Sequence, residues 1–175
     1  MARHTLRLAN ESPMGGHMCL YQRHLSQDTD SDFFSLAWFS QPCGPDSSLT
    51  FSWDMTYGLA WALTGPLGPG LIIEPGQLTP MAPDDQAPVD DSVPADQVSV
   101  ALTIAGRPIF ARQANRPGPF SFEPTPQYWI AFGPFEPGQV LDFNEIILTT
   151  EIKFAPGQTV ARAAFQRDCS WRVGR

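Results

Sequence analysis

Apolar side chains recur at every second position in three neighbouring runs between residues 33 and 63. A period of two puts such side chains on one face of a β-strand, whereas an amphipathic helix would need a spacing of three and four. The three expected faces consist of Phe34, Leu36 and Trp38; of Leu49, Phe51 and Trp53; and of Leu59, Trp61 and Leu63. A buried aromatic side chain removes about 150–250 Å² from water. This stretch is therefore predicted to form the centre of the core, with a turn at 41–46.

Short alternating runs continue along the rest of the chain, separated by turn residues. Further strands are expected at 3–9, 17–23, 71–74, 97–105, 107–112, 120–122, 127–132, 146–154, 159–166 and 169–173. The first two are expected to pair as a hairpin across the turn at 10–16. With 14 Gly and 18 Pro and no sustained helical spacing, the fold class is predicted to be all-β. The expected architecture is an antiparallel β-sandwich, jelly-roll-like or Greek key.

The length of 175 residues suits one domain, because a chain of this size buries about 70% of its surface on folding. Three cysteines, an odd number without framework spacing, are expected to be free thiols. No apolar run is long enough for a signal peptide or a transmembrane segment. The expected location is therefore the cytoplasm, or outside the cell after release without a signal peptide.

The net charge of −7 argues against nucleic acid as a partner, because that binding depends on basic side chains meeting phosphate. Residues 79–96 hold four prolines and five aspartates and few large apolar side chains. This segment is predicted to be an exposed acidic loop. The alternative is that its carboxylates collect a cation.

Asp28, Asp30 and Asp32 have the spacing that opens a calcium-binding loop. Counting from Asp28, however, Phe33 stands where an EF-hand needs glycine and Phe39 where it needs glutamate. An EF-hand is thereby excluded. The pattern favours a solvated turn, with an irregular Ca²⁺ site as the alternative.

His17 and Cys19 share a strand face, and His24 or Cys43 would be needed to complete a zinc site. No pair has recognised ligand spacing, so neither a metal nor a cofactor is expected. Nucleophile elbows, zinc-protease helices and glycine-rich phosphate loops are all missing from the sequence. A non-enzymatic role is expected, and an enzyme with an unrecognised site is the alternative.

Four aromatic residues have two readings, as core residues or as a binding surface for a sugar or a protein. They are Tyr57, Tyr128, Trp129 and Trp171. In the second reading the protein is a membrane-active or carbohydrate-binding module, and the turns at 65–70 and 133–138 are its contact tips.

Four short segments resemble the rhizosphere-induced RhiA-like proteins of soil and plant-associated bacteria. They are Asn10-Glu11-Ser12, Cys19-Leu20-Tyr21-Gln22, Ser35-Leu36-Ala37-Trp38 and Tyr128-Trp129-Ile130-Ala131. The resemblance implies a soluble, abundant bacterial protein whose production follows population density and the plant-root setting. It implies no molecular activity and no catalytic residues. The acidic loop at 79–96 departs from the family pattern.

The expected function is therefore binding or self-assembly by a non-enzymatic β-sandwich. A strand at the edge of a sheet pairs with a neighbouring molecule unless charge or proline blunts it. The Thr- and Ile-rich segment at 146–154 is the candidate edge. A protein or glycan partner is the alternative to self-association.

Overall fold

The computed structural model describes residues 2–23, 33–89, 91–115 and 127–174. Strands dominate these ranges, in which the helical elements are two single 3₁₀ turns at Pro75–Gln77 and Ala95–Gln97. The prediction of an all-β, sandwich-like protein is confirmed. No helix in the described part of the chain is long and apolar enough to cross a membrane. The predicted strand at 120–122 lies outside the described residues.

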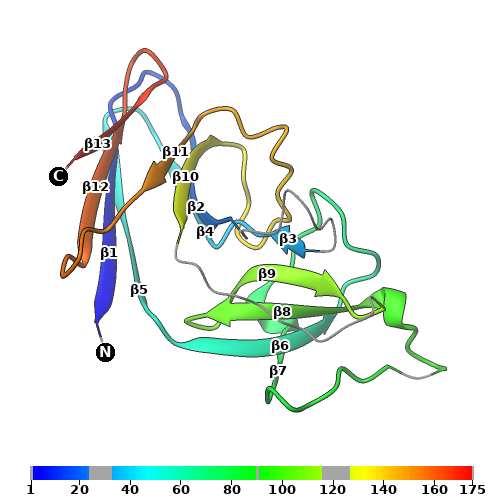
Figure 1. The fold of residues 1–175 in the computed structure, drawn as a ribbon. Helices are drawn as coiled ribbons and strands as arrows, with labels where there is room; N and C mark the ends of the chain where they lie inside the picture. The colour runs from blue at the N-terminus through cyan, green and yellow to red at the C-terminus, as the bar shows by residue number, and fades with distance from the viewer. Residues whose placement is uncertain (1, 24–32, 90, 116–126, 175) are drawn as a thin grey trace.

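The first sheet joins the two ends of the chain. Its order is β13 (Trp171–Gly174), β12 (Val160–Phe165), β1 (Arg3–Asn10) and β5 (Ser47–Asp54). The N-terminal strand β1 is antiparallel to β5 but parallel to β12. Figure 1 shows this sheet with the blue N-terminal and red C-terminal strands together. The parallel pair departs from the antiparallel prediction.

The second sheet packs against the first. Its order is β11 (Thr149–Ile152), β10 (Tyr128–Gly133), β2 (Gly16–Gln22) and β4 (Phe39–Cys43). The strand expected at 127–132 is present as β10 and lies inside the sheet, because it has a neighbour on each side. The predicted hairpin between the first two strands is wrong. They lie in different sheets, since β5 and β12 occupy both edges of β1.

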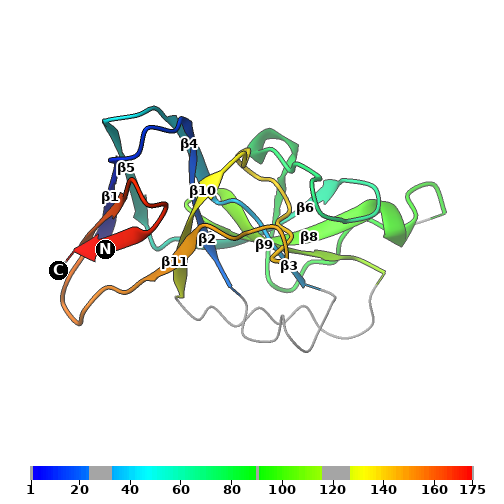
Figure 2. The ribbon, with the colours of Figure 1, turned by 90° about the horizontal axis from the view of Figure 1, so that it is seen from above.

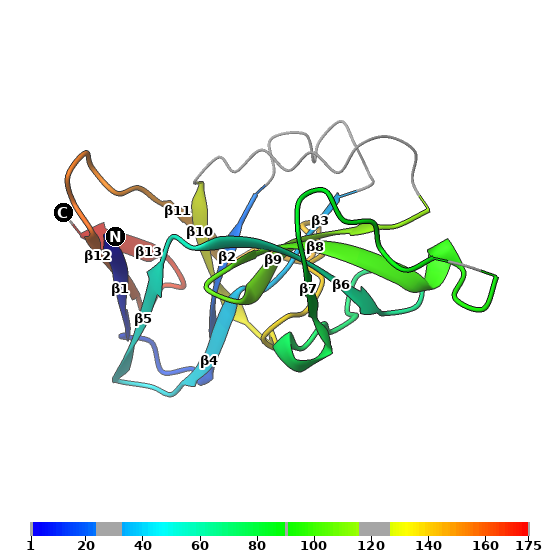
Figure 3. The same cartoon turned by 90° about the horizontal axis from the view of Figure 1, so that it is seen from below.

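The third sheet is ordered β3 (Phe33–Ser35), β9 (Arg107–Gln113), β8 (Val98–Ile104), β6 (Tyr57–Leu63) and β7 (Thr79–Met81). Figure 3 shows the chain running from β5 into β6 and so from the first sheet to the third. In Figure 2 the three sheets follow one another across the molecule, with the second in the middle.

The largest core cluster lies between the first and second sheets and is closed at one end by β8 and β9. Leu6 and Leu8 contribute from β1, and Met18 and Leu20 from β2. At its centre the rings of Trp38 and Trp53 meet edge to face, with centroids 5.0 Å apart. The expectation that 33–63 supplies the centre of the core is confirmed.

Two of the three predicted faces in that stretch are wrong, whereas Leu49, Phe51 and Trp53 do share a face. The first run breaks after β3, so that Leu36 enters a cluster with Ala62 and Ile73 while Trp38 enters the main core. Strand β4 then occupies part of the predicted turn at 41–46.

In β6 the fully buried positions are Ala60 and Ala62, while Leu63 is 56% exposed. The side of the sheet that holds Ala62, Ala101 and Ala111 packs closely against 67–78, where only small side chains fit. Side-chain size was therefore a poor guide to which face of β6 is buried.

The acidic loop at 79–96 is exposed along most of its described length, as predicted. Its first residues differ from the prediction because they form the edge strand β7, paired with β6. The predicted strand at 71–74 is reduced to a single bridge between Ile72 and Gln139.

Gly138 and Gly157 form a matched pair for testing how closely the chain at residue 138 packs on the backbone of Ile73. Both have a left-handed backbone, with φ of 78° and 79°. A Cβ on Gly138 would run into the carbonyl oxygen of Ile73, whereas a Cβ on Gly157 meets nothing within 4 Å. We expect Gly157→Ala to lower the free energy of unfolding by about 1 kcal/mol, from the left-handed backbone alone. Gly138→Ala should cost about 3 kcal/mol or more, because overpacking is added.

Urea unfolding of both variants measures the difference. If both variants lose the same free energy of unfolding, the close contact between Gly138 and the carbonyl oxygen of Ile73 does not contribute to stability.

Candidate functional site

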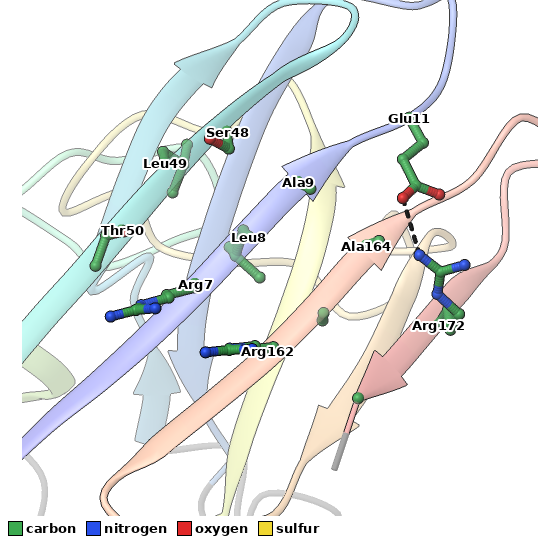
Figure 4. Close-up of a pocket in the computed structure, with 12 residues that line it drawn as sticks. Arg7, Leu8, Ala9, Glu11, Ser48, Leu49, Thr50, Arg162, Ala164 and Arg172 are labelled. Atoms are coloured by element: carbon green, nitrogen blue, oxygen red, sulfur yellow. Dashed lines mark hydrogen bonds and ion pairs between the residues drawn. The ribbon is translucent and has the colours of Figure 1, made fainter.

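An open groove of about 440 Å³ lies on the outward face of the first sheet. Ligand sites for small molecules have volumes of about 300–1,000 Å³. None of the described elements covers this face of the sheet in Figures 1 and 2. Figure 4 shows the residues around the groove, which come from all four strands of the sheet and from the turn after β1. They are Arg7, Leu8, Ala9, Glu11, Ser48, Leu49, Thr50, Arg162, Ala163, Ala164, Arg172 and Gly174.

The alternation of the strands decides which side chains reach the groove. In β1, Leu6 and Leu8 face the core, so Arg7 and Ala9 face outward. The parallel register sets Arg7 beside Arg162 and Ala9 beside Ala164. On the other side of β1, Thr50 of β5 is the register partner of Arg7, and Ser48 is the partner of Ala9.

Arg7 and Arg162 are aligned neighbours of like charge. Figure 4 shows the two side chains extending side by side from β1 and β12. Both are exposed, and neither makes an ion pair or hydrogen bond with another residue that the structure describes. Like charges directly opposite each other on a sheet are destabilising. Both guanidinium groups are therefore open to solvent and to any anion in it.

The floor beside this pair is flat and small. Ala9, Ala164 and Gly174 carry at most a methyl group, and Ser48 adds a hydroxyl at one side. A floor of this kind leaves room for the body of a ligand whose charged end meets the arginines. The described part of the lining contains no aromatic ring on which a ligand could stack.

Glu11 stands at one end of the groove and binds Arg172. The Nη2 of Arg172 donates to the Oε1 of Glu11 over 2.8 Å. Both side chains are exposed, at 60% for Arg172 and 45% for Glu11, so the pair adds little to stability. The described residues of the lining include three arginines and one glutamate, a net charge of +2 in a chain whose total is −7.

Buried polar side chains fix the turn that carries Glu11. The amide of Asn10 donates to the carbonyl oxygens of Met14, Cys43 and Gly44, over 2.7, 3.1 and 3.1 Å. Its Oδ1 accepts from the backbone N–H and the hydroxyl of Ser12. Asn10 and Ser12 are each 1% exposed, and the residue between them points outward. This gives the Asn10-Glu11-Ser12 segment a physical role, which is to present a carboxylate at the groove.

The described residues of the lining place no histidine beside the hydroxyl groups of the groove. A nucleophilic hydroxyl needs a nearby base to accept its proton. Among the lining residues that the structure describes, no histidine stands beside the hydroxyls of Ser48 and Thr50, and Glu11 is the one carboxylate. Arginine does not give up its proton in proteins.

The aromatic residues singled out from the sequence lie in different environments. Tyr128 is 4% exposed in the main core, and burial raises its pKa to about 12. Trp129 lies under the Arg23 guanidinium, 4.2 Å from the ring centroid. Trp171 packs on Phe165 and donates from Nε1 to the carbonyl of Leu148 over 3.1 Å. Of the four, Tyr57 has the most open side chain, at 43% exposed.

The metal candidates remain without a site in the part of the chain that the structure describes. Within it, no three His, Cys, Asp or Glu side chains gather closely enough to hold an ion. Asp28, Asp30, Asp32 and His24 lie outside the described residues. Cys19 is fully buried, and burial raises the pKa of its thiol.

Sequence reasoning missed the groove residues Arg7, Arg162, Arg172 and Glu11. A signal did exist, since Arg7 lies between inward-facing leucines and must face outward. The pairing of β1 with β12 could not be read from the sequence, because it joins segments more than 150 residues apart.

Comparisons with known proteins place the whole chain in one group. The model of the RhiA family matches residues 1–90 and 87–175. Protein RhiA of Rhizobium leguminosarum bv. viciae is 28% identical over 200 residues, which cover 98% of this chain and 86% of that protein. No solved structure gives a significant match. The resemblance drawn from four short segments is confirmed, and neither the name of the family nor that of the relative states a molecular activity.

Tyr128 predicts a pH dependence. Its hydroxyl is in contact with the Sδ of Met55, at 3.4 Å, and desolvation favours the neutral form. The unfolded chain releases this proton near pH 10 and the folded protein only near pH 12. The stabilisation is therefore complete below pH 10 and is lost as the pH rises to 12. In urea unfolding across this range, Tyr128→Phe should show a shallower fall than the wild type; parallel curves would contradict the assignment.

Proposed function

The chain belongs to the RhiA family, and for this member we propose a binding function without enzymatic chemistry, in which the groove on the first sheet takes a small anionic ligand. The family match covers the whole chain and therefore includes all four strands that build the groove.

The unpaired arginines Arg7 and Arg162 carry this proposal. Guanidinium groups form strong, charge-assisted hydrogen bonds to carboxylates and phosphates, often two at once. Two guanidinium groups on adjacent strands of one face present such donors together. A bound anion would also remove the repulsion between them.

The composition of the lining supports the absence of catalysis. Acid–base chemistry requires a group that changes its protonation state at the reacting atom. Glu11, the one acidic side chain among the described lining residues, already accepts a hydrogen bond from Arg172. The function expected from this arrangement is recognition of charge and shape.

Two single variants test the site. We expect Arg7→Gln and Arg162→Gln each to weaken the binding of gluconate and of inorganic phosphate about tenfold, because each removes a charge-assisted hydrogen bond worth about 1.5–3 kcal/mol. NMR chemical-shift titrations measure the affinity and show whether the shifts cluster on β1 and β12.

Arg3→Gln is the matched control. Arg3 lies on the same outward face of β1, but opposite Asp54 and outside the groove. The Arg3→Gln substitution removes the same charge from the protein and should leave the affinity for both anions unchanged. Equal loss in all three variants would mean that only the net charge matters, and no binding of either anion to the wild type would refute the proposal.

Self-association is a second candidate, supported by Ile147. This side chain is 81% exposed and lies two residues before the edge strand β11. An exposed apolar residue next to an open edge favours pairing with a second copy. The pair of Lys153 with Glu151, 3.4 Å apart, puts charges on the same edge and works against it.

Light scattering over a range of concentrations tests this candidate. If copies associate at β11, the average mass should rise with concentration, and Ile147→Thr should reduce that rise. Leu63→Thr, which alters another exposed apolar side chain, is the control. A mass independent of concentration would rule the candidate out.

A further inference from the structure

We propose that the groove selects ligands which combine a single carboxylate with several hydroxyl groups, and that Glu11 excludes ligands with a second negative charge. This inference rests on the proposed function and assigns the ligand class. The class includes the sugar acids, in which one end of a hydroxylated chain is ionised.

The first step is the separation of the two charged ends of the groove. Arg172 lies one strand away from Arg162 and two residues further along, because Gly174 is the register partner of Arg162. From the spacing of strands and of residues along them, the two backbone positions are about 8 Å apart. A six-carbon chain spans a comparable length. Its ionised end at Arg7 and Arg162 would bring the other end to Glu11 and Arg172.

At the far end of the groove, the guanidinium of Arg172 is already paired. Glu11 already supplies the anion for Arg172, so an incoming carboxylate would meet a negative charge and an occupied guanidinium. The backbone of Glu11 is held in place, because Asn10 and Ser12 are buried and hydrogen-bonded on either side of it. The backbone N–H of Glu11 also donates to the carbonyl of Phe165 over 2.8 Å.

Glu11 can accept a hydrogen bond from an uncharged group of the ligand. Its other oxygen, Oε2, receives no hydrogen bond from the described residues. A ligand hydroxyl can donate to it, and Ser48 and Thr50 offer hydroxyls along the opposite side of the groove. The small floor of Ala9, Ala164 and Gly174 leaves space for the carbon chain between these polar groups.

Gluconate and glucarate form a matched pair of probes. They share a six-carbon hydroxylated chain and differ only at the far end, where glucarate has a second carboxylate. We expect the wild type to bind gluconate about tenfold more tightly than glucarate in NMR titrations, since two like charges at contact distance cost that much or more at the dielectric of a protein surface. Sorbitol, which lacks both charges, should not bind measurably.

Glu11→Gln then reverses the preference. This variant removes the repulsion and frees Arg172, so glucarate should bind more tightly than gluconate. The exposed Glu11–Arg172 pair adds little stability, and unchanged urea unfolding will show that the fold is intact. Glu136→Gln, at an exposed carboxylate outside the groove, is the control and should keep the wild-type preference.

The outcomes separate the two proposals. If gluconate and glucarate bind the wild type equally, and both depend on Arg7, the groove is an anion site but Glu11 does not select. An unchanged preference in Glu11→Gln leads to the same conclusion. If neither gluconate nor phosphate binds, the proposed function fails together with the inference.

Discussion

The placement of β1 in the middle of the first sheet is the constraint on which the rest of the structure depends. With β5 on one edge and β12 on the other, β1 fixes both ends of the chain in one layer. Its inward side chains, Leu6 and Leu8, enter the main core. Its outward side chains define the floor and the charge of the groove. One strand therefore links the packing of the core to the candidate site.

The parallel pairing of β1 with β12 has a consequence for stability. It aligns Arg7 with Arg162, so that two positive charges stand beside each other. A partner residue of opposite charge would have neutralised Arg7. Residues at binding sites are commonly kept at some expense of stability, because function needs groups that folding alone would not select. The buried network of Asn10 and Ser12 represents the opposite case, in which fully satisfied polar groups hold a turn in one geometry. The groove thus has the paired carboxylate of Glu11 at one end and the two unpaired guanidinium groups of Arg7 and Arg162 beside its floor.

The sequence was informative where side chains alternate between a large apolar and a polar residue. The all-β class, the strands around Leu6, Leu20, Phe51 and Ile130, and the exposed acidic loop could be predicted in this way. The buried face of β6 could not, because Ala60 and Ala62 owe their burial to the close approach of another segment and not to their own hydrophobicity. The hairpin prediction failed because a local turn does not reveal that distant strands occupy both edges of β1. The groove was missed for the same reason, since Arg7 and Arg162 become neighbours only through a long-range pairing.

The central claim is that Arg7 and Arg162 are held together for ligand binding against their mutual repulsion. The most direct test is the free energy of unfolding of Arg162→Glu at low and high ionic strength. The substitution replaces like charges with opposite ones, so the account predicts a more stable protein at low salt, by about 0.5 kcal/mol. The gain should shrink at high salt, and gluconate binding should be lost. A variant that is no more stable than the wild type at low salt, or that still binds gluconate, would contradict the account.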